Sequence, residues 1–260
     1  ESNEELHRLL LERQIPHEWE VRSGGHDFTC WNTALPKAFR FINEYFNGKR
    51  SGNSESSLPN ETPFIQTANA TVYYPEQAQG STRKYPIIYV QGEINEQQQK
   101  VLVSQFHQMV DENKTWPAVL CFVKANTDLS ETISDIEKQL SGIRGSQRMR
   151  ALITLGDNIK EGIEAIQGEN LFTGIVCVNA IGNENDAQNL IKAVNSYKRY
   201  PRCWIEILPE SKEYGFSSNI HILLKESDLE HEFRSRKCKE ANVFTYWEDW
   251  ILYLNNRIHV

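Results

Sequence analysis

One histidine of this chain stands in a setting that suits proton transfer, and the chain repeats that setting without the histidine. Residues 24–26 read Gly-Gly-His and follow residues 17–19, which read His-Glu-Trp. Near the other end residues 231–233 read His-Glu-Phe, but the match to Gly-Gly-His at 240–242 reads Glu-Ala-Asn. An imidazole can accept a proton near neutral pH, whereas an amide cannot. The second copy therefore lacks the imidazole that the first copy carries directly after its two glycines.

The repeat also covers the segments on either side of these residues. The offset between the two copies is 231 − 17 = 214 at the first histidine. At the same offset, the segment ahead of each copy matches, with His7, Leu9 and Leu10 falling on His221, Leu223 and Leu224. The tryptophans that follow, Trp31 and Trp247, lie 247 − 31 = 216 apart, so the second copy carries extra residues between these anchors. The two copies share the residues around this segment, but only the first copy has a histidine at position 26, where the second has Asn242.

The composition excludes several classes of protein. A net charge of −7 over 260 residues argues against a nucleic-acid partner. The chain has no apolar run of about 18 residues, so no membrane-spanning helix is expected. The five cysteines show no CxxC spacing, which argues against a structural zinc site. We expect no cofactor and no metal.

The apolar pattern predicts a helix, a strand and a helix over 3–14, 17–22 and 29–46. Residues 48–63, rich in Gly, Ser, Asn and Pro, read as a linker. Beyond it strands and helices alternate, and runs such as 117–123 are apolar throughout, as in strands buried on both faces. The expected strands are 70–75, 85–91, 117–123, 150–155, 174–180, 202–208 and 230–236, and the expected helices are 95–112, 130–141, 158–167, 186–196, 215–226 and 244–257. This order predicts an α/β fold with a doubly wound, mostly parallel sheet.

Five segments carry a resemblance to a known family. Residues 84–90 (KYPIIYV) look like its first central strand, and 150–156 (RALITLG) look like the strand that enters the nucleophile turn. Residues 170–176 (NLFTGIV) look like the segment after the following helix, and 203–206 (CWIE) look like the strand before the acid loop. Residues 17–31 look like the last strand, the catalytic-histidine loop and the last helix. Together these segments resemble the α/β-hydrolases of the esterase family that includes feruloyl, acetyl-xylan and enterochelin-type esterases.

The resemblance implies a Ser-His-acid triad, and the matching positions have lost it. The nucleophile turn of such enzymes reads Gly-x-Ser-x-Gly. Here Asn158 stands where the serine belongs, followed by Lys160 and Glu161 in place of small residues. The acid position falls on Ser211, with Glu210 as an alternative acid, and the histidine position falls on Asn242. The turn expected to form the oxyanion hole, Gln-Gly-Glu at 91–93, also lacks the usual glycines. The alternative is that a serine elsewhere acts, and the candidates are Ser104, Ser130, Ser134 and Ser141.

The resemblance divides the chain into three parts. Residues 1–47 resemble the last helix, strand, histidine loop and helix of an upstream esterase domain, in which His26 would be catalytic. Residues 48–64 are the linker, and residues 65–260 are a degenerate esterase-like domain. A bare helix-strand-helix cannot bury a core of its own. Residues 1–47 should therefore pack on an upstream esterase domain, on another copy of the chain, or on residues 65–260.

The expected function is that of a tandem carboxylic-ester hydrolase, acting on polysaccharide-linked esters, with residues 65–260 inactive. One alternative is a non-enzymatic domain that binds carbohydrate or serves as a structural partner. Another is a residual hydrolase with chemistry other than a triad. Family members that act on polysaccharides are usually exported, so the resemblance implies a periplasmic or secreted protein.

Two further patterns lead to expectations about local structure. Trp247, Trp250 and Tyr253 have helical spacing and are expected to lie in the core rather than to form a sugar-binding platform. The charged run at 234–240 is interpreted as a solvated strand end and loop.

Overall fold

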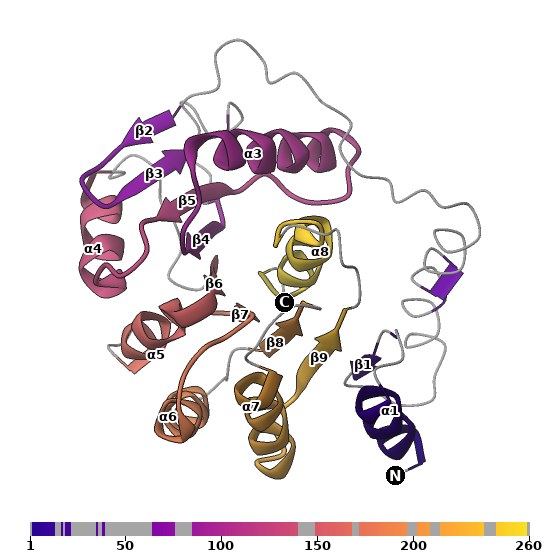
Figure 1. The fold of residues 1–260 in the computed structure, drawn as a ribbon. Helices are drawn as coiled ribbons and strands as arrows, with labels where there is room; N and C mark the ends of the chain where they lie inside the picture. Colours follow the sequence, from indigo (N-terminus) through magenta and orange to yellow (C-terminus); the bar gives the residue numbers. More distant parts are fainter. Residues whose placement is uncertain are drawn as a thin grey trace.

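The chain folds around one large β-sheet (Figure 1). The computed structural model describes residues 2–13, 17, 19–21, 35, 38–39, 64–75, 85–139, 149–167, 172–196, 202–208, 214–236 and 243–258. Within these residues the sheet has nine strands in the order β1-β9-β8-β7-β6-β4-β5-β3-β2. The strands are β1 Trp19–Val21, β2 Phe64–Gln66, β3 Ala70–Tyr73, β4 Ile87–Gln91, β5 Val119–Val123, β6 Arg150–Leu155, β7 Gly174–Val178, β8 Arg202–Ile207 and β9 His231–Ser235. The helices are α1 Ser2–Glu12, α3 Glu96–Asp111, α4 Leu129–Gln139, η3 Gly156–Asn158, α5 Ile159–Gln167, α6 Glu184–Asn195, α7 Tyr214–Glu226 and α8 Trp247–Ile258.

The sheet is mostly parallel, as the sequence predicts. Strands β4 to β9 run parallel to their neighbours, whereas β3 and β2 on one side and β1 on the other are antiparallel. Every residue of β4, β5, β6 and β7 is buried. The continuous apolar runs, from which strands buried on both faces were expected, therefore form the centre of the sheet.

Helices cover both faces of this sheet, because successive strand residues point to opposite sides. Tyr89 joins a core cluster with residues of α4, α5, α6 and α7, whereas Val90 joins a second cluster with residues of α3 and α8. Figure 1 shows the same two layers, with α3 and α8 on one side of the strands. The doubly wound α/β fold expected from the sequence is thus confirmed.

Two short segments differ from the sequence-based expectation. Strand β2 was not predicted, because its three residues lie half exposed at the sheet edge and show no alternation. It begins at Phe64, the last residue of the expected linker, and residues 48–63 lie outside the described part. Of the helix expected over 29–46, Leu35, Ala38 and Phe39 are described and are helical.

The N-terminal helix and strand pack on the rest of the chain. Strand β1 pairs antiparallel with β9, so it extends the sheet of residues 65–260 at one edge. Helix α1 contacts α7 through an ion pair between Glu4 and Lys225 and through a hydrogen bond between His7 and the Tyr214 hydroxyl. Of the three packing possibilities for residues 1–47, the described residues α1 and β1 adopt the third.

Each copy of the sequence repeat builds the same histidine pair. In the first copy His7 Nδ1 lies 2.7 Å from His17 Nε2, and in the second His221 Nδ1 lies 2.8 Å from His231 Nε2. Burial, and then the charge of His17, lowers the pKa of His7 to about 4. Burial, and then the charge of His231, lowers the pKa of His221 to about 4. His7 and His221 therefore favour the neutral ring.

These pairs predict that the protein loses stability in mild acid. The unfolded chain protonates its histidines below about pH 6.5, whereas folded His7 and His221 resist protonation until about pH 4. The free energy of unfolding should therefore be highest above about pH 6.5 and should fall as the pH drops toward 4. Urea unfolding at several pH values measures this slope.

A double variant, His7→Gln with His221→Gln, should flatten the slope between about pH 6.5 and 4. The control is His107→Gln, since His107 contacts Asp111 on the surface of α3. An equal pH slope in the double variant and the parent chain would contradict the expectation.

Candidate functional site

The position expected for a nucleophile lies in a turn between a strand and a helix. Strand β6 ends at Leu155, one turn of 3₁₀ helix covers Gly156–Asn158, and α5 begins at Ile159. Gly156 adopts φ 64°, a left-handed conformation that glycine accepts without strain. The predicted location of Asn158, after Leu155 and before Ile159, is confirmed.

Asn158 stabilises this turn through hydrogen bonds to the backbone. It is 2% exposed. Its Nδ2 donates to the Leu155 carbonyl at 2.8 Å, and its Oδ1 accepts from the Asn126 backbone N–H at 3.0 Å. The amide thus joins the end of β6 to the loop that follows β5. Both ends of the side chain are engaged within the protein rather than directed to a substrate.

The turn also lacks the strain of a catalytic elbow. A nucleophilic serine stands on a sharp, strained turn that lifts its oxygen clear of the sheet. In the described residues positive φ angles outside glycine occur at Asn113, Asn126, Asn179 and Asp228, and Asn158 is not among them. At Asn158 the described turn therefore shows no such backbone strain.

The helix after this turn, α5, packs closely on β6, although Lys160 and Glu161 stand where the resemblance places small residues. Lys160 is exposed. The close approach of α5 to β6 is made instead at Gly162, where an added Cβ would lie 3.0 Å from Thr154 Cγ2 and 3.3 Å from Leu152 Cδ2. The helix therefore keeps a glycine contact with the strand, shifted along the chain.

The turn after β4, where an oxyanion hole would form, is packed against an apolar side chain. A Cβ added at Gly92 would lie 2.8 Å from Leu155 Cβ, so Leu155 sits directly against this backbone. Next to it Gln91 is fully buried, and its Nε2 donates to the Thr127 carbonyl at 2.9 Å. The contacts of this turn thus link β4 to its neighbours in the fold.

The strands that should present the acid and the base end at the same edge as β6. Leu155 pairs with Val178 and Ile207 pairs with Ser235 in a parallel register, so these strands end side by side. In open α/β sheets this edge carries the ligand site. Glu210, Ser211 and Asn242, the other degenerate triad positions, and His26 lie outside the described residues.

The three alternative serines that the structure describes do not lie in a turn that follows a strand. Ser104 lies within α3, and Ser130 and Ser134 lie within α4, so none of the three follows a strand directly. Ser141 lies outside the described residues. In the described part of the chain, no group of three or more His, Cys, Asp or Glu side chains is placed to hold a metal ion. None of the described helices is long and apolar enough to cross a membrane.

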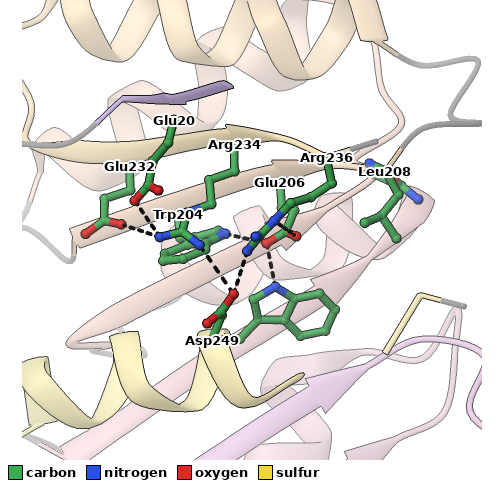
Figure 2. Close-up of polar contacts among 10 residues, drawn as sticks. Glu20, Trp204, Glu206, Leu208, Glu232, Arg234, Arg236 and Asp249 are labelled. Atoms are coloured by element: carbon green, nitrogen blue, oxygen red, sulfur yellow. Dashed lines mark hydrogen bonds and ion pairs between the residues drawn. The ribbon is translucent and has the colours of Figure 1, made fainter. Parts of the chain in front are cut away.

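A buried ionic network that was not predicted from the sequence lies near the carboxyl ends of β8 and β9 (Figure 2). Its centre is Glu206 of β8, which is fully buried. This carboxylate accepts hydrogen bonds from Trp204 Nε1 at 2.8 Å, Trp250 Nε1 at 2.6 Å and Arg236 Nε at 3.0 Å. A buried carboxylate remains ionised only with such donors and an opposite charge.

Two arginines of the second repeat copy continue the network. Asp249 of α8 accepts from Arg236 Nη2 at 2.7 Å and from Arg234 Nη1 at 3.4 Å. Arg234 also bonds Glu20 of β1 at 2.5 Å. Arg234 lies over the Trp204 ring with its guanidinium carbon 4.1 Å from the centroid. The network therefore connects β1, β8, β9 and α8.

The interpretation of 234–240 as a solvated strand end and loop is wrong for the described residues, since Arg234 and Arg236 are both buried. Residues 237–240 lie outside the described part. The sequence did hold a signal: Glu206 stands inside the apolar run Cys-Trp-Ile-Glu-Ile, and a carboxylate in a buried strand needs a buried cation. The expectation for Trp247, Trp250 and Tyr253 is confirmed, since all three are core residues.

A groove of about 550 Å³ lies where the two repeat copies meet. Helices α1 and α7 form its sides, and its lining includes His7, Trp19, Tyr214, His221 and Phe233. His7 stacks on Trp19 with ring centroids 4.7 Å apart, and His221 stacks on Phe233 at 4.5 Å. Equivalent residues of the two copies thus face one another across the groove.

Removing the central cation of the network should destabilise the protein strongly. Arg236→Met leaves Glu206 and Asp249 without their closest cation, and breaking a buried pair costs about 3–5 kcal/mol of unfolding free energy. The control is Arg202→Met, which removes a half-exposed ion pair to Glu230 and should cost at most about 1 kcal/mol. Chemical denaturation measures both values. Equal costs for the two variants would contradict the role assigned to the network.

Comparisons with known proteins bear on the fold. By sequence the chain matches no family model and no curated protein. Among solved structures it is similar to a ferulic acid esterase, with TM-score 0.56 and 14% identity over 72% of this chain and 91% of that one. It is also similar to the enterobactin esterase of Shigella flexneri, with TM-score 0.59 and 8% identity over 81% of this chain and 62% of that one. A fluorophosphonate-binding serine hydrolase of Staphylococcus aureus matches with TM-score 0.54 and 13% identity over 76% of this chain and 97% of that one.

Proposed function

We propose, from the premise that this chain has the α/β-hydrolase fold of esterases, that residues 65–260 are a catalytically inactive esterase-like domain. The observation that carries the proposal is Asn158, which occupies the nucleophile position, is buried and has both ends of its amide hydrogen-bonded. An amide at this position cannot form an acyl-enzyme.

The remaining catalytic power is expected to be negligible. A triad enzyme that loses its nucleophile or base retains roughly 10³–10⁴-fold rate enhancement from the oxyanion hole and binding. Here Asn158 and Asn242 replace the nucleophile and the base, and the oxyanion turn is packed against Leu155. The rate enhancement that an oxyanion hole could still provide therefore has little support in this structure.

The proposal further places the chemistry in a preceding module of the same parent protein. Residues 1–47 repeat the last elements of residues 65–260, and they retain His26 after two glycines. His26 would act there as the general base that activates a serine for acyl transfer. Ferulic acid esterases among the structural neighbours favour an ester linked to a polysaccharide as the substrate class.

A fluorophosphonate probe tests this assignment. The full-length parent protein should be labelled on a serine ahead of Glu1 and should hydrolyse feruloyl or short-chain esters. The chain of residues 1–260 should show neither labelling nor turnover, because its nucleophile position holds Asn158. In the full-length protein His26→Ala should abolish labelling, and His107→Ala, on the surface of α3, should not. Stoichiometric labelling of a serine within 65–260 together with turnover would refute the proposal.

Restoring the serine should cost stability without restoring labelling. Asn158→Ser removes the amide that bonds both Asn126 and Leu155, and the unfolding free energy should fall by about 1–3 kcal/mol. The new hydroxyl would remain buried in a relaxed turn. The matched control, Asn195→Ser on the exposed end of α6, should change stability by less than about 0.5 kcal/mol. Probe labelling and urea unfolding read the two effects, and rapid labelling of Ser at 158 would contradict the structural role.

A further inference from the structure

The strands that meet at the sheet edge are equivalent members of the repeat. Strand β1 pairs with β9 so that Glu20 lies opposite Arg234, and 234 − 20 = 214 is the offset of the repeat itself. Trp19 pairs with Ser235, the equivalent of Val21, and Val21 pairs with Phe233, the equivalent of Trp19. This reciprocal register is that of a two-fold interface, in which the same surface is used by both partners.

The helices packed beside these strands follow the same relation. Helix α1 lies against α7, its counterpart in the repeat, with His7 and His221 lining one groove between them. His7 is hydrogen-bonded to His17, just ahead of β1, and His221 is hydrogen-bonded to His231, the first residue of β9. The helix–strand units α1–β1 and α7–β9 are therefore related by a local pseudo-two-fold axis that passes near Glu20 and Arg234.

The two units differ in what covers their outer apolar face. In α7, Ile220 is 0% exposed because it packs on the sheet of its own domain. Its equivalent in α1, at the offset of 214, is Leu6, which is 55% exposed. In α8, Ile251 is 0% exposed, whereas its equivalent at the offset of 216 is Leu35, which is helical and 43% exposed. Positions that cover a sheet in one copy are thus exposed in the other.

We infer that Leu6 and Leu35 cover the two opposite faces of the β-sheet of a second module of the same fold, as Ile220 and Ile251 do here, and that this module joins the present one edge to edge through β1 and β9. A second copy of residues 65–260 does not fit this place, because its own α7 and α8 already cover the equivalent faces. The occupant is a module that has no last strand and flanking helices of its own and receives them from the segment that holds α1, β1 and Leu35. The inference rests on the proposed tandem arrangement and adds its interface: a continuous sheet across two modules.

Contacts between the two helix–strand units explain why the two modules would be held in one orientation. Glu20 and Arg234 form an ion pair at the pseudo-two-fold axis, and Arg234 is 2% exposed. A second ion pair, between Glu4 and Lys225, joins α1 to α7. Backbone pairing of β1 with β9 fixes the register between them. The module that owns Leu6 and Leu35 is therefore anchored to this domain by its own last strand.

Accessibility of Leu6 in the full-length parent protein tests the inference. Leu6→Cys should react with a maleimide at least about tenfold more slowly in the full-length protein than in the chain of residues 1–260. Val101→Cys, at an exposed site on α3, should react equally in both proteins and is the control. Peptide mass spectrometry assigns the label, which separates it from the native cysteines. Equal reactivity of Leu6→Cys in both proteins, or a parent polypeptide without a module ahead of Glu1, would overturn the inference.

A second variant keeps the test independent of labelling chemistry. Leu6→Asp should leave the thermal midpoint of residues 1–260 within about 2 °C, because the site is exposed there. In the full-length protein it should lower the midpoint by about 4 °C or more, because the carboxylate would be buried against a sheet. An unchanged midpoint in both proteins would count against the inference. Neither readout uses activity, so labelling of a serine within 65–260 would refute the proposed function and leave this interface standing.

Discussion

Glu206 lies fully buried inside β8, and a carboxylate in that position has to find its counter-charge within the protein. Arg236 supplies the charge, two tryptophan indoles supply further donors, and Asp249 balances the second arginine, Arg234. The network therefore fixes how α8 crosses the sheet. It also reaches β1, since Arg234 bonds Glu20. The edge strand β1 is thus held by an ionic network whose central carboxylate, Glu206, lies two strands away in β8.

The turn that follows β6 combines the connection of a nucleophile turn with a different set of contacts. The strand–turn–helix at Asn158 keeps the connection of a nucleophile elbow, and Gly162 keeps the close contact between helix and strand. The strain that makes such a turn reactive is absent, and an amide now bonds the neighbouring backbone. Strain stored at a functional site is costly and persists only where it serves a purpose. A turn that has exchanged strain for hydrogen bonds is consistent with an inactive domain.

The repeat gives the molecule its second organising feature. Two copies of one helix–strand unit meet through equivalent surfaces, with a histidine pair in each. Antiparallel pairing of equivalent edge strands satisfies the backbone groups that an open edge would expose. It also leaves Leu6 of α1 exposed, which is the observation that motivates the proposed second module.

The sequence alone determined the layers of this fold, because buried parallel strands must be apolar throughout and the helices between them must be amphipathic. It located Asn158 in the turn after β6, because a strand, turn and helix in succession depend on local order along the chain. It did not reveal the pairing of β1 with β9, because strand partners 214 residues apart are chosen by packing and not by local pattern. It also assigned Arg234 and Arg236 to solvent, because charge in a sequence indicates exposure unless a buried partner is known. That partner, Glu206, is brought next to them only by the parallel pairing of β8 with β9, and this pairing is a decision of the tertiary structure.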